Sequence, residues 1–182
     1  MRRSFGTGEA VASRLEVTRM RRRHLRGIMA IERQVYARPW SPNLFVAEMT
    51  EPHNRCYLVA RIDKTVVGYA GMICYGDEAH ITNIAVDPQR HRHGIGGRLL
   101  YEQMGRSIEM GATAVSLEVR VTNWGAQRLY ARFGFHPVGI RRRYYQELNE
   151  DALIMWTDDV RTEAYRARLD RLGTELVGAP ES

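Results

Sequence analysis

The sequence predicts a mixed α+β fold, in which antiparallel hairpins precede a β-α-β centre. Short β-branched runs alternate with longer segments whose apolar residues recur every three or four positions, as in amphipathic helices. Glycine, proline, serine and asparagine separate these segments where helices and strands are expected to start or stop. With 182 residues, of which 44% are hydrophobic, the chain is long enough to bury the core of one domain.

The first half of the chain is predicted to contain a strand, two helices and three further strands. Pro39 ends the first helix, and Ser41 before Pro42 is typical of an N-cap followed by proline in the first turn. Asp63-Lys64 is suited to the tight turn of a hairpin. In chain order we expect a strand over 15–19, helices over 24–37 and 42–50, and strands over 55–62, 66–75 and 80–86.

The second half is predicted to alternate helices and strands. Gly94 opens a long helix that Gly111 ends, and Asn123 is a good N-cap for a shorter helix. Strands are expected over 114–121, 135–140 and 152–156, and a charged helix over 158–173. We therefore expect a flexible tail over 1–13, one domain over 14–157, and a helical or flexible extension over 158–182.

Charge and composition exclude several classes of protein. No apolar run approaches about 20 residues and no signal-peptide core follows the basic N-terminus, so we expect a cytoplasmic protein without a membrane span. The net charge of +6 fits either a solvated surface or attraction for phosphates, of a nucleotide-like cofactor or of RNA. Cys56 and Cys74 are expected in the core, and no metal site is expected.

A glycine-rich loop between a predicted strand and helix carries the first chemical signal. Its sequence is His91-Arg92-His93-Gly94-Ile95-Gly96-Gly97. Glycines allow close approach of a ligand, and the N–H groups at a helix start attract anions such as a pyrophosphate. A tight strand-to-helix turn explains the same glycines, and the loop lacks the Gly-Lys-Ser/Thr of a Walker loop.

Several ordered motifs together resemble the GCN5-related N-acetyltransferase (GNAT) superfamily. These motifs are Asn83–Pro88, Arg92–Gly97, Leu117–Asn123 and Leu129–Phe135. Three further segments, Arg38–Ser41, Arg141–Tyr145 and Glu150–Met155, resemble the RimI-type branch, which acetylates the N-terminal alanine of ribosomal protein S18. The resemblance covers about residues 15–157 and implies the GNAT fold, with a splayed, mostly antiparallel sheet. His91 departs from it, because the family usually has Gln or Arg there.

The resemblance implies a binding site for the co-substrate acetyl-CoA. The backbone of Ile84, Ala85 and Val86 is expected to pair with the pantetheine arm, and one N–H there to stabilise the developing oxyanion. Asn123 is expected either to contact CoA, to cap a helix, or to do both. The pyrophosphate cradle is expected to comprise Arg92, His93, Gly94, Ile95, Gly96 and Gly97.

The same resemblance implies two catalytic residues. Glu118 matches the general base, and its position in an apolar strand predicts a raised carboxyl pKa; a glutamate on the polar face of a strand is the plainer alternative. Tyr130 matches the general acid that protonates the leaving thiolate, although its helical spacing also suits a core aromatic. No nucleophile is apparent, so we expect direct transfer in a ternary complex.

Aromatic residues are expected to bind the acceptor. Trp40 is either an anchor in the peptide groove or a staple between helices, and Tyr144 and Tyr145 match the opposite wall. The arginines at 141–143 form a solvated edge or meet RNA, although direct nucleic-acid binding is not required. The implied partner is a protein N-terminus, that of ribosomal protein S18. A broader N-terminal or small-amine acetyltransferase and a non-catalytic acyl-CoA-binding module remain alternatives.

Overall fold

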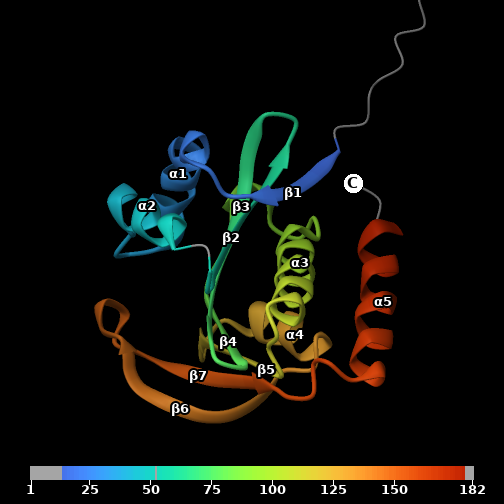
Figure 1. Cartoon of the computed structure of the whole chain (residues 1–182). Coiled ribbons are helices and arrows are strands. Elements are labelled where there is room, and N and C mark those ends of the chain that lie inside the picture. Colours follow the sequence, from blue (N-terminus) through green and yellow to red (C-terminus); the bar gives the residue numbers. More distant parts are fainter. Residues whose placement is uncertain (1–13, 52, 179–182) are drawn as a thin grey trace, which may run out of the picture.

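The computed structural model describes residues 14–51 and 53–178, and it contains a seven-stranded sheet (Figure 1). The strands are β1 (Leu15–Arg19), β2 (Arg55–Ile62), β3 (Thr65–Tyr75), β4 (Glu78–Val86), β5 (Ala114–Arg120), β6 (His136–Tyr145) and β7 (Glu150–Thr157). Their order across the sheet is β1-β2-β3-β4-β5-β7-β6. The pairing of β4 with β5 is parallel and all the other pairings are antiparallel, which confirms the predicted fold class.

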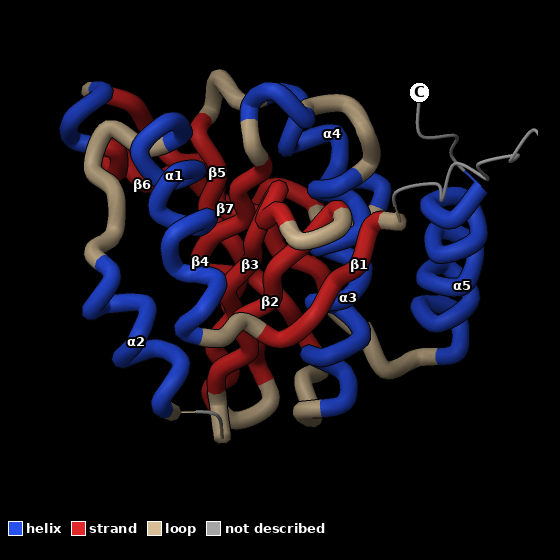
Figure 2. The backbone as a smooth tube through the Cα atoms, turned by 90° about the horizontal axis from the view of Figure 1, so that it is seen from above, coloured by secondary structure: helices blue, strands red, loops and turns tan. Residues whose placement is uncertain are grey.

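Helices cover both faces of this sheet (Figures 1 and 2). Described helices of at least nine residues are α1 (Leu25–Val35), α2 (Pro42–Thr50), α3 (Ile95–Glu109), α4 (Trp124–Arg132) and α5 (Glu163–Gly178). Helices α1 and α2 pack on one face, and α3 packs on the other with α5 outside it. Strand β2 shows why two cores form: Val59 joins the core under α1, and its neighbours Leu58 and Ala60 join the core under α3.

Most predicted boundaries are confirmed to within a few residues, because the capping residues act as expected. The Ser41 hydroxyl accepts a hydrogen bond from the Leu44 N–H, and the Asn123 side chain accepts one from the Ala126 N–H at 3.2 Å. Gly94 has a φ of +73° at the N-cap of α3, which suits glycine. None of the described helices is long and apolar enough to cross a membrane.

Two elements differ from the prediction. Strand β6 continues to Tyr145 instead of ending at residue 140, because β7 starts at Glu150 and pairs with it as far as Tyr145. The last helix starts at Glu163 and runs to Gly178, five residues beyond the predicted end. A turn precedes it, in which Asp159 has a φ of +54°. The tail predicted over 1–13 lies outside the described residues.

Helix α5 contributes to the main hydrophobic core. Tyr165, Leu169 and Leu172 are buried in the same cluster as Leu100 and Met104 of α3. The Tyr165 hydroxyl donates a 2.8 Å hydrogen bond to the backbone oxygen of Phe133, just after α4. The part of the predicted C-terminal extension that forms α5 is therefore packed against the rest of the fold.

The centre of the sheet opens into a fork. Parallel pairing of β4 with β5 covers four residue pairs and ends at Ile81 and Leu117, although both strands continue. A bulge lies at the same place: Gly71 of β3 pairs with Asn83 and Met72 with Ile81, so that Thr82 is the extra residue. Bulges bend a strand and are common beside active sites. After Ile81, one edge of β4 still pairs with β3, whereas its other edge no longer pairs with β5 and is open.

Candidate active site

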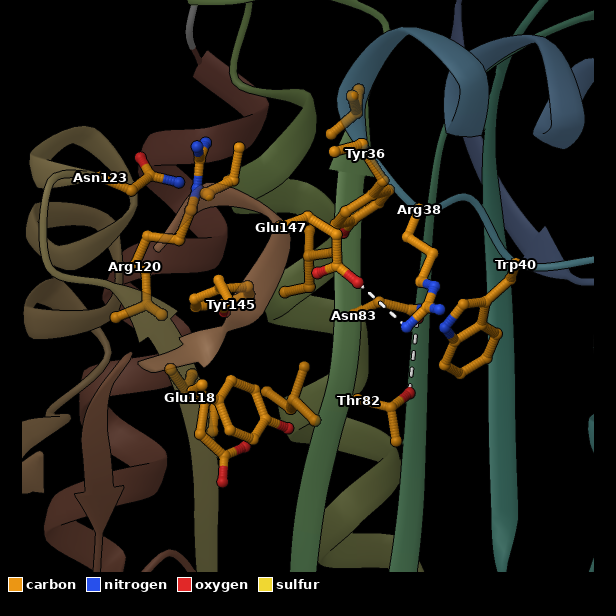
Figure 3. A pocket seen from close by; sticks show the side chains of 18 of the residues that line it. Tyr36, Arg38, Trp40, Thr82, Asn83, Glu118, Arg120, Asn123, Tyr145 and Glu147 are labelled. Atoms are coloured by element: carbon orange, nitrogen blue, oxygen red, sulfur yellow. Dashed lines mark hydrogen bonds and ion pairs between the residues drawn. The ribbon is translucent and has the colours of Figure 1, made fainter. Parts of the chain in front are cut away.

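A cleft of about 330 Å³ lies at the fork (Figure 3). One side is formed by the end of α1 and the segment that leads to α2, and the floor by β4 and β5. The opposite side is formed by the start of α4 and by the turn between β6 and β7. The cleft is lined by five of the residues predicted from the sequence to bind substrate or act in catalysis, namely Trp40, Glu118, Tyr130, Tyr144 and Tyr145, and by Ile84 and Asn123.

Glu118 lies on β5, one residue past the last parallel pair. Its side chain is 8% exposed, with Oε2 3.0 Å from His80 Nε2 and Oε1 3.4 Å from Arg141 Nε. The hydrogen bond from His80 holds the pKa of the Glu118 carboxyl below its ordinary value, against the effect of burial. The predicted rise in the pKa of Glu118 is therefore wrong. Its polar partners, His80 on β4 and Arg141 on β6, are distant in the sequence and could not be recognised there. Glu118 is ionised at neutral pH.

Tyr130 lies on α4 and is both a core residue and a cleft residue. Its ring is 5.9 Å from that of Phe135, and 8% of the residue is exposed. Burial raises the pKa of the Tyr130 phenol above its ordinary value. The hydroxyl is therefore protonated throughout the physiological range, as a proton donor must be.

Glu32 is a cleft residue that the sequence analysis missed. It lies on α1, is 1% exposed, and accepts hydrogen bonds from the Tyr69 hydroxyl and, at 2.6 Å, from the Trp40 N–H. Burial raises the pKa of Glu32 to about 7, although the Trp40 N–H acts in the opposite direction. The sequence does contain a signal for Glu32, because this charged residue falls on the apolar face of the predicted helix, between Ile28 and Val35.

Aromatic side chains form the two walls of the cleft. The Trp40 ring lies 5.4 Å from that of Phe45, so Trp40 is a staple between helices as well as a wall residue. The rings of Tyr144 and Tyr145 meet edge to face, 5.2 Å apart. Arg38 and Glu147, on opposite walls, form a 3.0 Å ion pair across the cleft (Figure 3).

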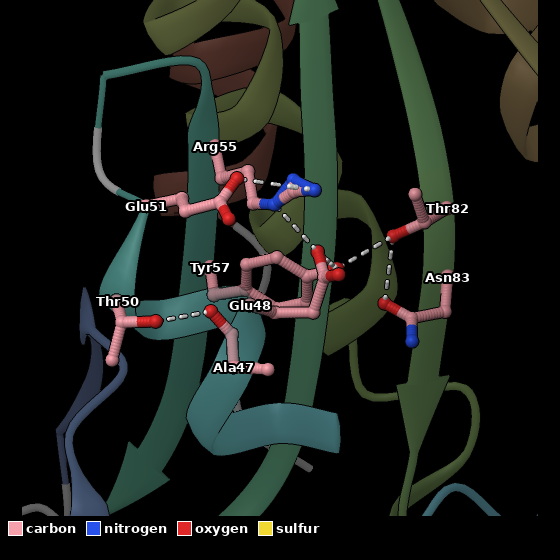
Figure 4. Close-up of polar contacts among 8 residues, drawn as sticks. All are labelled: Ala47, Glu48, Thr50, Glu51, Arg55, Tyr57, Thr82 and Asn83. Carbon is pink, nitrogen blue, oxygen red and sulfur yellow. Dashed lines mark hydrogen bonds and ion pairs between the residues drawn. The ribbon is translucent and has the colours of Figure 1, made fainter. Parts of the chain in front are cut away.

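A polar network behind the cleft supports its floor (Figure 4). The Tyr57 hydroxyl of β2 donates to Glu48 of α2 at 2.8 Å and lies 3.3 Å from the Thr82 hydroxyl. Arg55 makes a 3.1 Å ion pair with Glu48. This network connects α2 to Thr82, the bulged residue of β4, where the fork begins.

The glycine-rich loop lies beyond the end of β4, outside the lining of the cleft. Arg92 and Gly94 have positive φ values of 72° and 73°, in the segment that connects the end of β4 at Val86 to the start of α3 at Ile95. The first N–H groups of an α-helix have no intrahelical partner and bind anions well. A ring nitrogen of His91 lies 3.2 Å from the Val86 oxygen, and one of His93 lies 2.9 Å from the His91 oxygen.

The fork and the loop together fit the parts of acetyl-CoA. The open β4 edge over Ile84–Val86 suits an amide-containing arm, and the start of α3 suits a pyrophosphate. Ile84 lines the cleft, whereas the Ala85 side chain is buried in the core under α1, so Ala85 has only its backbone to offer. No three His, Cys, Asp or Glu side chains of the described residues are grouped so as to hold a metal ion.

A forked sheet beside a helix start that suits an anion fits an acyl-CoA-dependent acyltransferase. The family model of the acetyltransferase (GNAT) family matches residues 25–135. The N-alpha-acetyltransferase RimI of Mycobacterium tuberculosis is 43% identical over 124 residues, covering 66% of this chain and 76% of that protein. The ribosomal protein bS18-alanine N-acetyltransferase of Salmonella typhimurium is 38% identical over 128 residues, covering 69% and 84%.

A solved structure is also similar. The crystal structure of the ribosomal-protein-S18-alanine N-acetyltransferase from Escherichia coli has a TM-score of 0.72 and 30% identity, covering 80% of this chain and 94% of that one. The chain belongs to the GNAT family and is an acetyl-CoA-dependent N-acetyltransferase. The predicted family and enzyme class are thus confirmed.

Proposed function

We propose that this enzyme transfers the acetyl group of acetyl-CoA to the α-amine of a protein N-terminus, and that its acceptor is the N-terminal alanine of ribosomal protein S18. The observation that carries the proposal is a cleft with an ionised carboxylate at its floor, Glu118, and aromatic walls on both sides. Such walls suit an extended chain end with a small first side chain. The names of the relatives from Salmonella typhimurium and Escherichia coli support the same acceptor.

Glu118 accepts the proton that the acceptor amine loses. An α-amine has a pKa of about 8, so roughly a tenth of it is neutral at pH 7 without assistance. A carboxylate with a lowered pKa is a weak base toward the free ammonium ion. The nitrogen becomes far more acidic as it bonds to the acyl carbon, and at that point the carboxylate can take its proton. Glu118 therefore acts during the attack rather than before it.

Tyr130 supplies the proton for the leaving group. As the carbon–nitrogen bond forms, the carbon–sulfur bond breaks and the thiolate takes the phenolic proton. The start of α3 and the open edge of β4 hold the co-substrate. We further propose that the backbone N–H groups along this edge stabilise the charge on the acyl oxygen. Because the acceptor is a ribosomal protein, we also propose a cytoplasmic location.

The test is acetylation of synthetic peptides followed by mass spectrometry. Peptides that begin with alanine and carry one internal lysine are compared with the same peptides blocked at the N-terminus, and with versions that begin with methionine or leucine. We expect acetylation of the α-amine of the alanine peptide, and a fall on the order of 10²-fold in kcat/KM for Glu118→Gln. Acetylation of lysine at a comparable rate in the blocked peptide would refute the proposal. Equal rates for all three first residues would refute the restriction to alanine.

A further inference from the structure

A histidine stands directly behind the carboxylate at the floor of the cleft. His80 lies on β4, and the parallel ladder places it opposite Ser116 of β5. Its Nε2 atom is 3.0 Å from Glu118 Oε2, and its Nδ1 atom is 3.0 Å from Ser116 Oγ. Both ring nitrogens therefore have partners on the neighbouring strand, and the ring cannot turn without losing one of them.

Burial makes this contact more than a surface ion pair. The Glu118 side chain is 8% exposed, so the carboxylate is shielded from solvent, whereas the His80 side chain is 34% exposed. Arg141 of β6 is farther away, at 3.4 Å, and its side chain is 56% exposed. Tyr144 and Tyr145 of β6 line the same cleft as the carboxylate, and the residue opposite it on β7 is the apolar Ile154.

The geometry explains how the carboxylate keeps one orientation. A hydrogen bond from Nε2–H to Oε2 fixes the side-chain torsions of Glu118 and leaves its other lone pairs for the amine. The Ser116 hydroxyl can both donate and accept, so it can pair with Nδ1 whether the imidazole is neutral with its proton on Nε2 or carries a proton on both nitrogens. The strand register supplies this support, because residues 116 and 118 lie on the same face of β5.

We propose that His80, anchored by Ser116, is the positioning residue for the Glu118 carboxylate. It aims the carboxylate into the cleft, and it does not itself touch the substrate. The role in catalysis rests on the proposed function, whereas the effect of His80 on the carboxylate is a property of the free enzyme. The two are therefore separable by experiment.

Two substitutions at this position separate the hydrogen bond from the packing. His80→Leu removes the donor at similar bulk, and His80→Gln keeps an N–H donor within reach of Oε2. We expect His80→Leu to lower kcat for the alanine peptide on the order of tenfold, and His80→Gln to restore most of it. KM for acetyl-CoA and the thermal unfolding temperature should change little. His136→Gln, at an exposed histidine of β6, is the matched control and should behave as wild type.

A second readout needs no acceptor. The carboxyl carbons of ¹³C-labelled glutamate are titrated by NMR in the free enzyme, and the Glu118 signal is assigned by its loss in Glu118→Gln. We expect the Glu118 midpoint to move to higher pH in His80→Leu, to stay near wild type in His80→Gln, and to move less in Ser116→Ala than in His80→Leu. Should His80→Leu fold but unfold early, Ser116→Ala provides the milder test.

Unchanged titration and unchanged kcat in His80→Leu would overturn the proposal. A normal titration with reduced turnover would overturn it as well, because the loss would then come from elsewhere. If the wild-type enzyme fails to acetylate any peptide N-terminus, the proposed function fails, and the titration still decides whether His80 holds the carboxylate.

Discussion

Glu32 gives the enzyme a stability that depends on pH in a predictable direction. Its carboxyl is 1% exposed, and burial raises its pKa from about 4.5 to about 7. Between these values the folded chain keeps a proton that the unfolded chain has released, so the free energy of unfolding falls as pH rises. The rise in pKa corresponds to about 3 kcal/mol, lost between about pH 4.5 and pH 8.

Glu32→Gln isolates this contribution. The glutamine oxygen can still accept the Trp40 N–H, and its amide can donate to the Tyr69 hydroxyl, so the two hydrogen bonds are kept without a titrating group. Urea unfolding is measured for both proteins from pH 4.5 to pH 8.5. We expect the variant to gain about 3 kcal/mol relative to wild type over this range.

The control is Glu109→Gln, which removes one negative charge from an exposed position on α3 and should run parallel to wild type. Parallel curves for Glu32→Gln and wild type would refute the reasoning, because they would mean that Glu32 binds protons equally in both states. A change in the slope of unfolding against urea would point to altered compactness instead.

Three further predictions concern the cleft. Tyr130→Phe should lower kcat on the order of 10²-fold while the thermal unfolding temperature changes little, since the ring packing on Phe135 is kept; early melting with normal turnover per folded molecule would make Tyr130 purely structural. Gly71→Ala should cost about 1–3 kcal/mol of unfolding free energy, because a Cβ there would lie 2.4 Å from the Tyr57 ring and 2.5 Å from Asn83 Oδ1. Gly105→Ala, with nothing within 4 Å, is its matched control and should be neutral or slightly stabilising; equal effects would contradict the steric argument. Glu147→Gln and Arg38→Gln should each lower the peptide KM by up to about fivefold without changing the KM for acetyl-CoA, because the exposed ion pair across the cleft is weak and must open; an unchanged peptide KM would mean that the pair does not obstruct the acceptor.

Local signals were sufficient to predict most of the fold. Ser41, Gly94 and Asn123 occupy the predicted helix starts, because capping depends on nearby backbone groups. The end of β6 was not predictable in this way. Its last residues are ordered by pairing with β7, and such pairing depends on a partner strand rather than on local preference.

The sequence predicted several residues of the cleft but not its electrostatics. Motif order placed Glu118, Tyr130 and Trp40 in one cleft. The pKa of Glu118 depends on His80, 38 positions earlier in the chain, which reaches it through the parallel register of β4 and β5. Glu32 was missed for a related reason. Its carboxylate is tolerated on an apolar helix face only because Trp40 and Tyr69 supply donors from other elements.

The fork also has a mechanical meaning. Four residue pairs join β4 to β5, so the two halves of the sheet share little backbone pairing at its centre. The pantetheine arm of acetyl-CoA, bound along β4, would form backbone hydrogen bonds where β5 no longer pairs with that strand. Both walls of the cleft flank this gap, so an arm bound there would lie between the carboxylate of Glu118 and the open edge of β4.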